Sequence, residues 1–325
     1  MSPREPVPLP PPLSDLPFGV ADLRLAGLSP ERARRGDLRR VTHGLYRVLD
    51  VASAEWAGLD YPEAPVPWAP EEAAAVVSLT GGVVSHLSAL LLHRLIVPPW
   101  VWPDGRLHVS RPHRLGVCDR AGVVTHSRTV PHEDVVLLHG IPVTAVERTW
   151  LDLASMMPRG PVGPVVIAGD ALVNRPWIEA EGARGEPITS IEALQAALRR
   201  AGRFKGVRVA RAALDLVRVG ADSPPETELR LALVDAGLPE PELQASGDPE
   251  DRFAPVADLG YRAWKLTLQY DGAYHRSREQ QARDARRDGW FHDRGWRSLR
   301  LTADDRLDGF RRAITWVRRH GPGLS

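Results

Sequence analysis

The stretch DLGYRAWKLTLQYDGAYH, Asp258 to His275, constrains the fold more than any other part of the chain. Two apolar runs flank a short turn at Tyr261–Ala263, which predicts a β-hairpin. The second strand alternates polar with apolar residues: Lys265, Thr267, Gln269 and Asp271 with Leu266, Leu268 and Tyr270. This period places the polar set on one face and the apolar set on the other. Polar groups on a packed strand need a reason, and a metal-and-phosphate site would be one.

Size and composition narrow the class of protein. The chain has 325 residues, of which 43% are hydrophobic and 26% charged, so we expect two or three globular domains. No apolar run reaches the roughly 18 residues that span a bilayer, and the Pro-rich start is not a secretion signal. We therefore expect a cytoplasmic protein without a membrane partner. The single cysteine, Cys118, excludes an internal disulfide and a Cys-based zinc site.

Charge is balanced overall but uneven along the chain. The net charge of +1 creates no whole-protein field that would select a polyanion. From Arg262 to Ser325, however, 15 Arg and Lys face 8 Asp and Glu. The C-terminal part is therefore the more basic one.

The first 59 residues predict a disordered tail over residues 1–13 and a small winged helix-turn-helix over residues 14–59. Helices are expected at residues 20–28 and 31–36, and a β-wing at residues 38–48 with Gly44 at its tip. Six arginines would decorate the second helix and the wing, where phosphate contacts are made: Arg32, Arg34, Arg35, Arg39, Arg40 and Arg47. The alternative is a solvated arginine-rich surface.

Residues 60–160 predict an α+β domain, followed by a helical connector over residues 161–222 with an exposed loop at 179–187. Helices are expected at 71–79 and 85–95, strands at 107–110 and 123–127, and a further helix through Trp150 and Leu151. This part holds seven histidines: His86, His93, His108, His113, His126, His132 and His139. None has the spacing of paired metal ligands, so we interpret them as packing or surface residues.

The C-terminal domain is predicted over residues 223–325. Ser223-Pro224-Pro225-Glu226 is a helix-start signal, and Gly237 ends that helix. Strands at 253–258 and 264–271, a helix at 278–294, a strand at 296–302 and a helix at 304–319 follow. The order α-β-β-α-β-α predicts an α/β sandwich with a central mixed sheet.

Phosphodiester cleavage needs a divalent cation held by hard oxygen ligands, which polarises the phosphate and activates a water molecule. Asp258 and Asp271 supply carboxylates and Gln269 an amide oxygen. Glu226 supplies an acid from the helix, and Lys265 a cation on the matching face. His275, just beyond the hairpin, is placed to act as an acid or a base.

The C-terminal block resembles the DUF559 and very-short-patch-repair-like branch of the PD-(D/E)XK (restriction-endonuclease-like) nucleases. The similarity covers about 100 residues in five ordered blocks: residues 223–242, the Asp258 hairpin, LQYDGAYHR at 268–276, QQARDARRDGW at 280–290 and GWRSLRLTADD at 295–305. It implies a Mg²⁺ or Mn²⁺ site built from Asp258, Gln269 and Glu226, with Asp271, His275 and Lys265 assisting catalysis. It also implies a nucleic-acid-binding set: Arg276, Asp284, Arg287 and Arg300.

One position departs from the family pattern, because Gln269 stands where glutamate is usual. An amide oxygen still ligates a metal, but the lost charge should weaken Mg²⁺ binding by roughly one to a few kcal/mol. The local alternatives are structural. Asp258 and Asp271 would end a strand and begin a turn, Glu226 would be a first-turn charge, and Asp284 and Arg287 a surface ion pair. His275 would pack in the domain and Lys265 would be a solvated lysine.

The front half resembles the AbiEi-type antitoxins, which join a winged helix to an α/β companion domain. The matching blocks are RRGDLRRVTHGLYRV at 34–48, VVSHLSALLLHRL at 83–95 and GIPVTAVERTWLDLA at 140–154. Together the resemblances imply a DNA-binding protein with a metal-dependent endonuclease domain, acting in defence or repair. The alternative is a non-catalytic regulator of the antitoxin type, with DNA and a toxin protein as partners.

Overall fold

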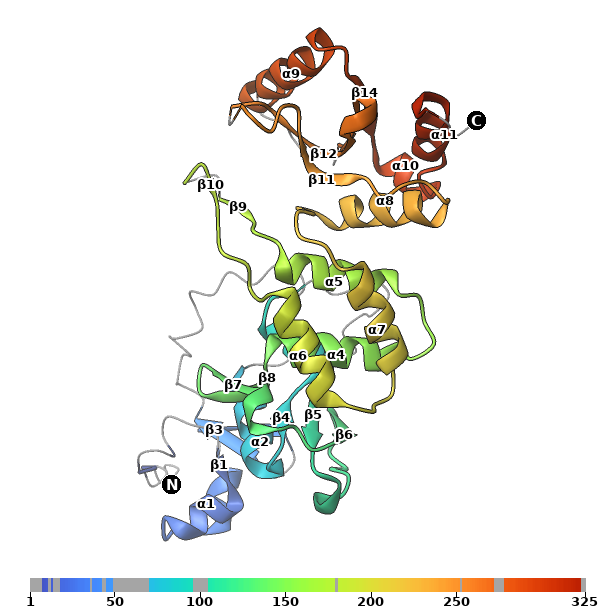
Figure 1. Cartoon of the computed structure of the whole chain (residues 1–325). Coiled ribbons are helices and arrows are strands. Elements are labelled where there is room, and N and C mark those ends of the chain that lie inside the picture. The colour runs from blue at the N-terminus through green and yellow to red at the C-terminus, as the bar shows by residue number, and fades with distance from the viewer. Residues whose placement is uncertain are drawn as a thin grey trace. The chain divides into compact units, whose positions relative to one another are not determined.

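The computed structural model describes residues 8–10, 13, 18–35, 37–42, 45–48, 70–95, 105–178, 181–251, 253–271 and 278–322 (Figure 1). The chain is a mixed α/β protein that divides into two compact units, Met1–Met156 and Met157–Ser325. Among the described helices, none combines the length and the apolar character needed to cross a membrane.

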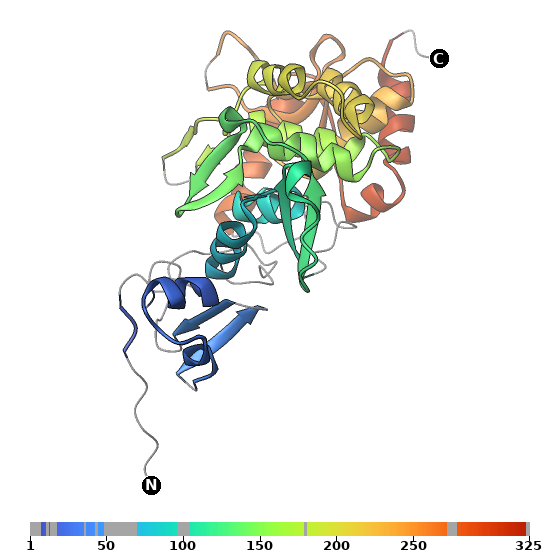
Figure 2. The same ribbon diagram turned by 90° about the horizontal axis from the view of Figure 1, so that it is seen from below.

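The first part of the N-terminal unit is a three-stranded sheet with a short helix (Figure 2). Its elements are β1 Phe18–Gly19, α1 Val20–Leu25, the 3-10 helix Pro30–Arg34, β2 Leu38–Thr42 and β3 Leu45–Val48, with strand order β1-β3-β2. Phe18, Leu23 and Leu38 form its core. The predicted helix over 31–36 is therefore wrong in type, because Ser29 caps a five-residue 3-10 turn instead.

The rest of this unit is a five-stranded sheet with three helices. Its elements are α2 Pro70–Thr80, β4 Val83–Val84, α3 His86–Leu92, β5 Leu107–Arg111, β6 Val123–Ser127, β7 Val135–Leu138, β8 Ile141–Thr144 and α4 Val146–Met156. The strand order is β6-β5-β4-β8-β7, with parallel pairing of β5 to β6 and of β4 to β8. The expected strands at 107–110 and 123–127 are confirmed, whereas β4 and β7 were not predicted.

The second unit opens with three helices, so residues 161–222 are mostly helical as expected, and they belong to the same compact unit as the C-terminal sheet. The helices are α5 Gly163–Val173, α6 Ile191–Ala201 and α7 Val207–Leu216. In place of a plain exposed loop, β9 Trp177–Ile178 and β10 Ala183–Arg184 pair in an antiparallel hairpin.

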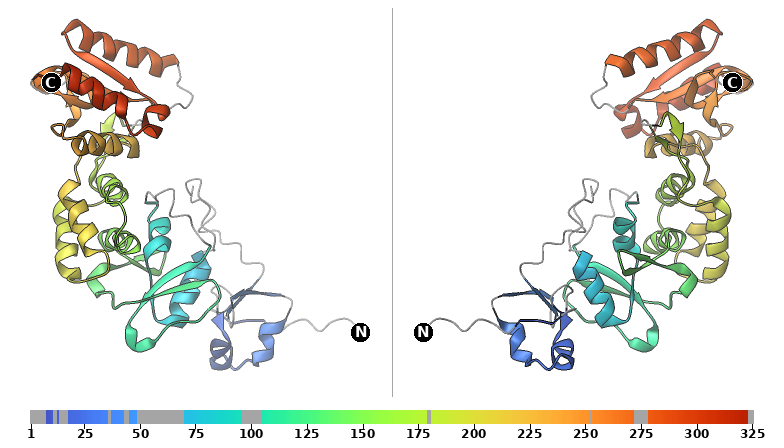
Figure 3. Two further views of the ribbon diagram at one scale, coloured as in Figure 1. Left: turned by 90° about the vertical axis from the view of Figure 1, so that its right-hand side faces the viewer. Right: turned by 90° about the vertical axis from the view of Figure 1, so that its left-hand side faces the viewer.

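The C-terminal domain is a four-stranded sheet between helices. Its elements are α8 Pro224–Asp235, β11 Glu242–Ser246, β12 Val256–Tyr261, β13 Leu266–Tyr270, α9 Arg278–Asp293, β14 Arg297–Leu301, α10 Ala303–Leu307 and α11 Arg311–His320. The strand order is β11-β12-β13-β14, with β13 and β14 parallel and the other neighbours antiparallel. Figure 3 shows α9 and α11 on opposite sides of this sheet.

Two apolar clusters hold the layers together. Leu229 of α8 and Val317 of α11 pack with Leu268 on one side of the sheet. Phe291 of α9 packs with Ala257 and Trp296 in the other cluster. Because helices cover both faces, β13 is buried along most of its length, including the polar residues Thr267 and Gln269.

The predicted order α-β-β-α-β-α is incomplete in two places. The strand β11 adds an edge to the sheet before the hairpin. The expected single helix at 304–319 is two helices, because Phe310 adopts a left-handed backbone with φ of 58° between α10 and α11. The helix start at Ser223 and its end before Gly237 are confirmed.

Candidate functional site

The candidate site lies where β12 and β13 separate. The outermost pair of the hairpin joins Leu259 to Leu268, so Asp258 and Gln269 are the next residues outward on the two strands. Beyond that pair, the backbone N–H of Tyr270 donates to Asp258 Oδ2 at 2.8 Å. Alternation along each strand places Asp258 and Gln269 on the face away from Leu259 and Leu268.

Asp258 is a half-buried acid. Burial raises the pKa of its carboxyl group, and the Tyr270 N–H and the positive charge of Arg287 oppose that rise. Asp222 and Asp284 act in the same direction as burial, since their negative charges repel an ionised Asp258. The carboxylate therefore has one cationic neighbour, Arg287, and two acidic neighbours, Asp222 and Asp284, that influence its pKa.

Glu226 extends this acidic region from the first turn of α8. Its carboxylate accepts hydrogen bonds from the Asp222 N–H at 2.9 Å and from the Ser223 hydroxyl at 2.7 Å. The side chain is 6% exposed, and burial followed by the charge of Asp258 raises its pKa from 4.5 to about 7. The expected helix acid is thus close enough to Asp258 for the two charges to interact.

Arg287, on helix α9, lies between Gln269 and the acidic residues. Its guanidinium donates to Gln269 Oε1 and lies 3.3 Å from Asp284 Oδ1. Gln269 is 3% exposed, and its Nε2 has no hydrogen-bond partner among the described residues. Asp258 and Gln269 therefore share one cationic neighbour, Arg287.

Two further predicted residues, Arg300 of β14 and Asp271 after β13, form a second ion-pair group with Asp288 of α9. Arg300 donates to Asp288 Oδ2 at 2.6 Å and lies 3.6 Å from Asp271 Oδ2. Asp271 follows the end of β13, where its N–H donates to the Leu301 carbonyl oxygen at 2.7 Å. Arg287 and Arg300, expected to contact nucleic acid, are thus engaged by carboxylates of their own domain.

Lys265 is the predicted site residue that the structure places elsewhere. It stands in the turn before β13 with φ of 51°, and its ammonium group donates to the Arg294 carbonyl oxygen at 3.1 Å. The expectation that it shares the strand face of Gln269 is wrong, because the left-handed turn at Lys265 precedes the paired strand. His275 and Arg276 lie outside the described residues.

The predicted arginines of the N-terminal part divide into different environments. Arg34 and Arg35 are exposed. Arg32 is buried and forms a bidentate pair with Asp37, with N–O distances of 2.8 and 2.5 Å, so the expectation of a phosphate contact there is wrong. Arg39, Arg40 and Arg47 stand on β2 and β3, where Arg39 is opposite Arg47 across the strands.

The site offers oxygen ligands, which a hard divalent cation prefers, but few of them. It offers the carboxylates of Asp258 and Glu226 and the amide oxygen of Gln269. Among the described residues, no group of three or more His, Cys, Asp or Glu side chains is placed to hold a metal ion. Any cation would therefore depend on the amide oxygen that Arg287 contacts and on ligands from water or substrate.

Sequence reasoning missed the residues that support Glu226. Asp222, whose N–H donates to Glu226, accepts hydrogen bonds from the Arg184 guanidinium and from Asn174 Nδ2. Arg184 lies on β10 and also donates to Gln244 Oε1 at 2.7 Å. Arg184 is 38 residues from Asp222 and 60 residues from Gln244 in the sequence, so no local sequence pattern predicts these contacts.

A buried polar cluster in the N-terminal unit was also missed. The rings of His86 and His126 stack with centroids 3.4 Å apart, and His126 Nε2 lies 3.1 Å from His108 Nδ1. Asp152 Oδ2 lies 3.7 Å from His86 Nδ1, and Arg148 donates to Asp152 Oδ1 at 3.0 Å. The sequence predicts His86 and His108 as individual packing or surface residues, whereas the structure places both in one buried polar network.

No known protein family, curated protein or solved structure matches this chain. The functional argument therefore depends on the residues and their geometry.

Proposed function

We propose that this chain binds DNA and that its C-terminal domain is a restriction-endonuclease-like sandwich that hydrolyses phosphodiester bonds with Mg²⁺ or Mn²⁺, in defence or repair. The observation that carries this proposal is a pair of acids, the half-buried Asp258 and the buried Glu226, beside the amide oxygen of Gln269. The negative charge of Asp258 raises the pKa of Glu226, and a cation bound by both carboxylates would stabilise their ionised forms.

The chain's own residues hold and orient the reacting groups in this proposal. Asp258, Gln269 and Glu226 would bind the metal ion, which supplies polarisation of the phosphate and a more acidic water molecule. The Tyr270 N–H fixes Asp258, and the Ser223 hydroxyl fixes Glu226, so both carboxylates are preorganised. Arg287 lies beside the acids, where a guanidinium can bind a phosphate oxygen.

Plasmid cleavage tests this proposal. Purified protein is incubated with supercoiled plasmid and Mg²⁺ or Mn²⁺, alongside Asp258→Ala and the control Asp293→Ala, an exposed aspartate at the end of α9. We expect nicking by the wild type and by Asp293→Ala, and its loss in Asp258→Ala. Equal nicking by Asp258→Ala, or none by the wild type with either metal, would refute the proposal.

The second candidate function is a non-catalytic, DNA-binding regulator of the antitoxin type that keeps the nuclease fold as a binding surface. The hydrogen bond from Arg287 to Gln269 Oε1 favours it, because a permanent cation already contacts that oxygen. Gln269→Glu separates the candidates, since it restores the usual acid of the family pattern. Cleavage gained only in Gln269→Glu would identify a decayed site, and binding without cleavage in both forms supports the regulator.

A further inference from the structure

The segment from Arg199 to Arg211, RRAGRFKGVRVAR, concentrates positive charge in the helical connector. It contains six Arg and Lys residues and no acidic residue. It ends α6, crosses a short turn and begins α7. Like charges at this density repel one another, and a polyanionic partner would offset that repulsion.

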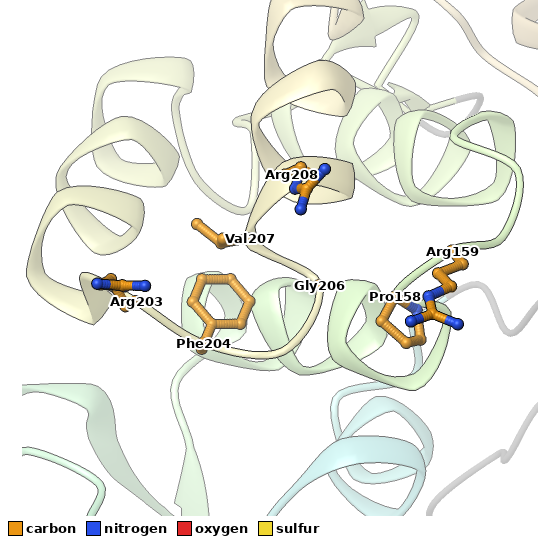
Figure 4. Close-up of a pocket in the computed structure, with 7 residues that line it drawn as sticks. All are labelled: Pro158, Arg159, Arg203, Phe204, Gly206, Val207 and Arg208. Carbon is orange, nitrogen blue, oxygen red and sulfur yellow. The ribbon is translucent and has the colours of Figure 1, made fainter.

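The turn in this segment lines an open pocket of about 530 Å³ (Figure 4). Its lining residues are Pro158, Arg159, Arg203, Phe204, Gly206, Val207 and Arg208. Arg203 comes from the turn after α6, Arg208 from the first turn of α7 and Arg159 from the segment before α5. Three guanidinium groups from three segments thus surround one pocket.

These arginines differ from their neighbours in what they contact. Arg175, Arg184 and Arg218 of the same unit pair with Glu186, Asp222 and Glu240. The three arginines of the pocket are exposed, and within the described part of the chain none of them forms a hydrogen bond or an ion pair. Their charges are therefore available to a ligand.

The backbone of the turn supports this arrangement. Gly206 is buried and adopts φ of 94°, a conformation that side-chain-bearing residues rarely adopt, and it begins α7 directly after Phe204 and Lys205. The first turn of α7 carries no acidic residue, so its positive end is not offset by a side chain. The glycine allows the tight turn into α7, and the absence of a first-turn acid leaves the charge of the arginines unopposed there.

We infer that this pocket binds the phosphodiester backbone of duplex DNA, a proposal that rests on the proposed DNA-binding function. Guanidinium groups bind phosphate oxygens in bidentate fashion and carry no sequence preference on the backbone. Along the sequence the cations continue beyond the pocket, to Arg199 in the last turn of α6 and to Arg211 in α7, so more cations are near the pocket than one phosphate group needs. A backbone suits these cations better than a free phosphate ion.

Salt-dependent DNA binding without metal tests the inference. The affinity of full-length protein for a labelled duplex is measured by fluorescence anisotropy in EDTA, from about 50 to about 200 mM salt. Arg203→Gln/Arg208→Gln is compared with Arg297→Gln/Arg319→Gln, two exposed arginines of the same unit outside the pocket. We expect the pocket variant to lower the slope of log affinity against log salt by about 2, and the control by less than about 1.

The outcomes separate this inference from the proposed function. Equal slopes for the pocket variant and the wild type, or no salt-dependent binding by the wild type, would overturn the inference, whatever the plasmid assay shows. A pocket-dependent slope without plasmid cleavage would support the pocket while the nuclease proposal fails. If pyrophosphate protects the wild type from thermal unfolding more than the pocket variant, while DNA slopes are equal, the pocket binds small anions only and the inference is wrong.

Discussion

The salt bridge between Asp170 of α5 and Arg230 of α8 offers a sharp test of how the second unit is held together. Both side chains are 1% exposed, and Arg230 Nη2 lies 2.8 Å from Asp170 Oδ2. The carboxylate also accepts hydrogen bonds from the Thr227 hydroxyl and the Arg218 N–H, both at 2.8 Å. Burial raises the pKa of Asp170, and the charge of Arg230 opposes that rise.

Arg230→Met removes the cation and leaves the carboxylate buried. Removing one partner of a buried pair costs about 3–5 kcal/mol of unfolding free energy. We expect the lower end, about 3 kcal/mol, because Thr227 and the Arg218 N–H remain and because Arg230 Nε has no hydrogen-bond partner among the described residues. Because the folded-state pKa of Asp170 lies above its unfolded value, ionisation of this buried group lowers stability as the pH rises through that pKa. The destabilisation caused by Arg230→Met should therefore be smaller in acid.

The assay is urea unfolding followed by far-UV circular dichroism at about pH 5 and about pH 7.5. Arg230→Met is compared with the wild type, with Asp170→Asn/Arg230→Met and with the control Arg319→Met, an exposed arginine of α11. The double variant should recover most of the lost stability, because no buried charge is left unpaired and Glu240, which also contacts Arg230, keeps its pair with Arg218. A loss below about 1 kcal/mol, or one equal at both pH values, would refute this reasoning.

Three further predictions concern the C-terminal domain. Asp305 accepts hydrogen bonds from the Arg312 guanidinium and the Thr302 N–H, which lowers the pKa of its carboxyl group to about 2. Asp305→Asn should therefore cost about 1 kcal/mol of stability near neutral pH. The thermal stabilities of the wild type and the variant should converge as the pH falls through about 2. Burial and the charge of Asp258 raise the pKa of Glu226 from 4.5 to about 7. The metal-free wild type should therefore lose up to about 3 kcal/mol of stability as the pH rises from about 4.5 to about 7, a loss absent from the pH profile of Glu226→Gln. Phe310→Gly relieves the backbone strain of the φ of 58° but empties a buried site. A deleted phenyl ring costs about 3–5 kcal/mol and the strain about 1 kcal/mol. Thermal unfolding should therefore show a net loss of stability of about 2–4 kcal/mol.

The sequence predicts the hairpin well because its signal is local. The alternation of Leu266, Leu268 and Tyr270 and the turn signal at Tyr261–Ala263 are properties of neighbouring residues. Lys265 was misplaced because the left-handed turn depends on how β13 enters the sheet, which alternation alone does not encode. The split at Phe310 was missed for a similar reason, since its spacing with Ile314 and Val317 also fits one continuous helix.

Contacts between distant elements were beyond sequence reasoning. The hydrogen bond from Arg287 to Gln269 spans 18 residues, and the support of Asp222 by Arg184 spans 38. Both depend on which helix face meets the sheet and on where the β9–β10 hairpin lies. The edge strand β11 was missed because ELQAS carries no clear alternation and gains its structure by pairing with β12.

The charge around Asp258 decides the order in which ligands can bind there. Asp222, Glu226 and Asp284 are its acidic neighbours, and Arg287 is engaged by Gln269 and Asp284. A phosphate group would meet net negative charge at this place, so a cation must bind first or Arg287 must leave Gln269. DNA bound without metal should therefore be held mainly by arginines elsewhere, and the pocket at Arg203 and Arg208 is such a place. Binding in EDTA that depends on those arginines and is unchanged by Asp258→Ala would fit this order, whereas binding abolished by Asp258→Ala would contradict it.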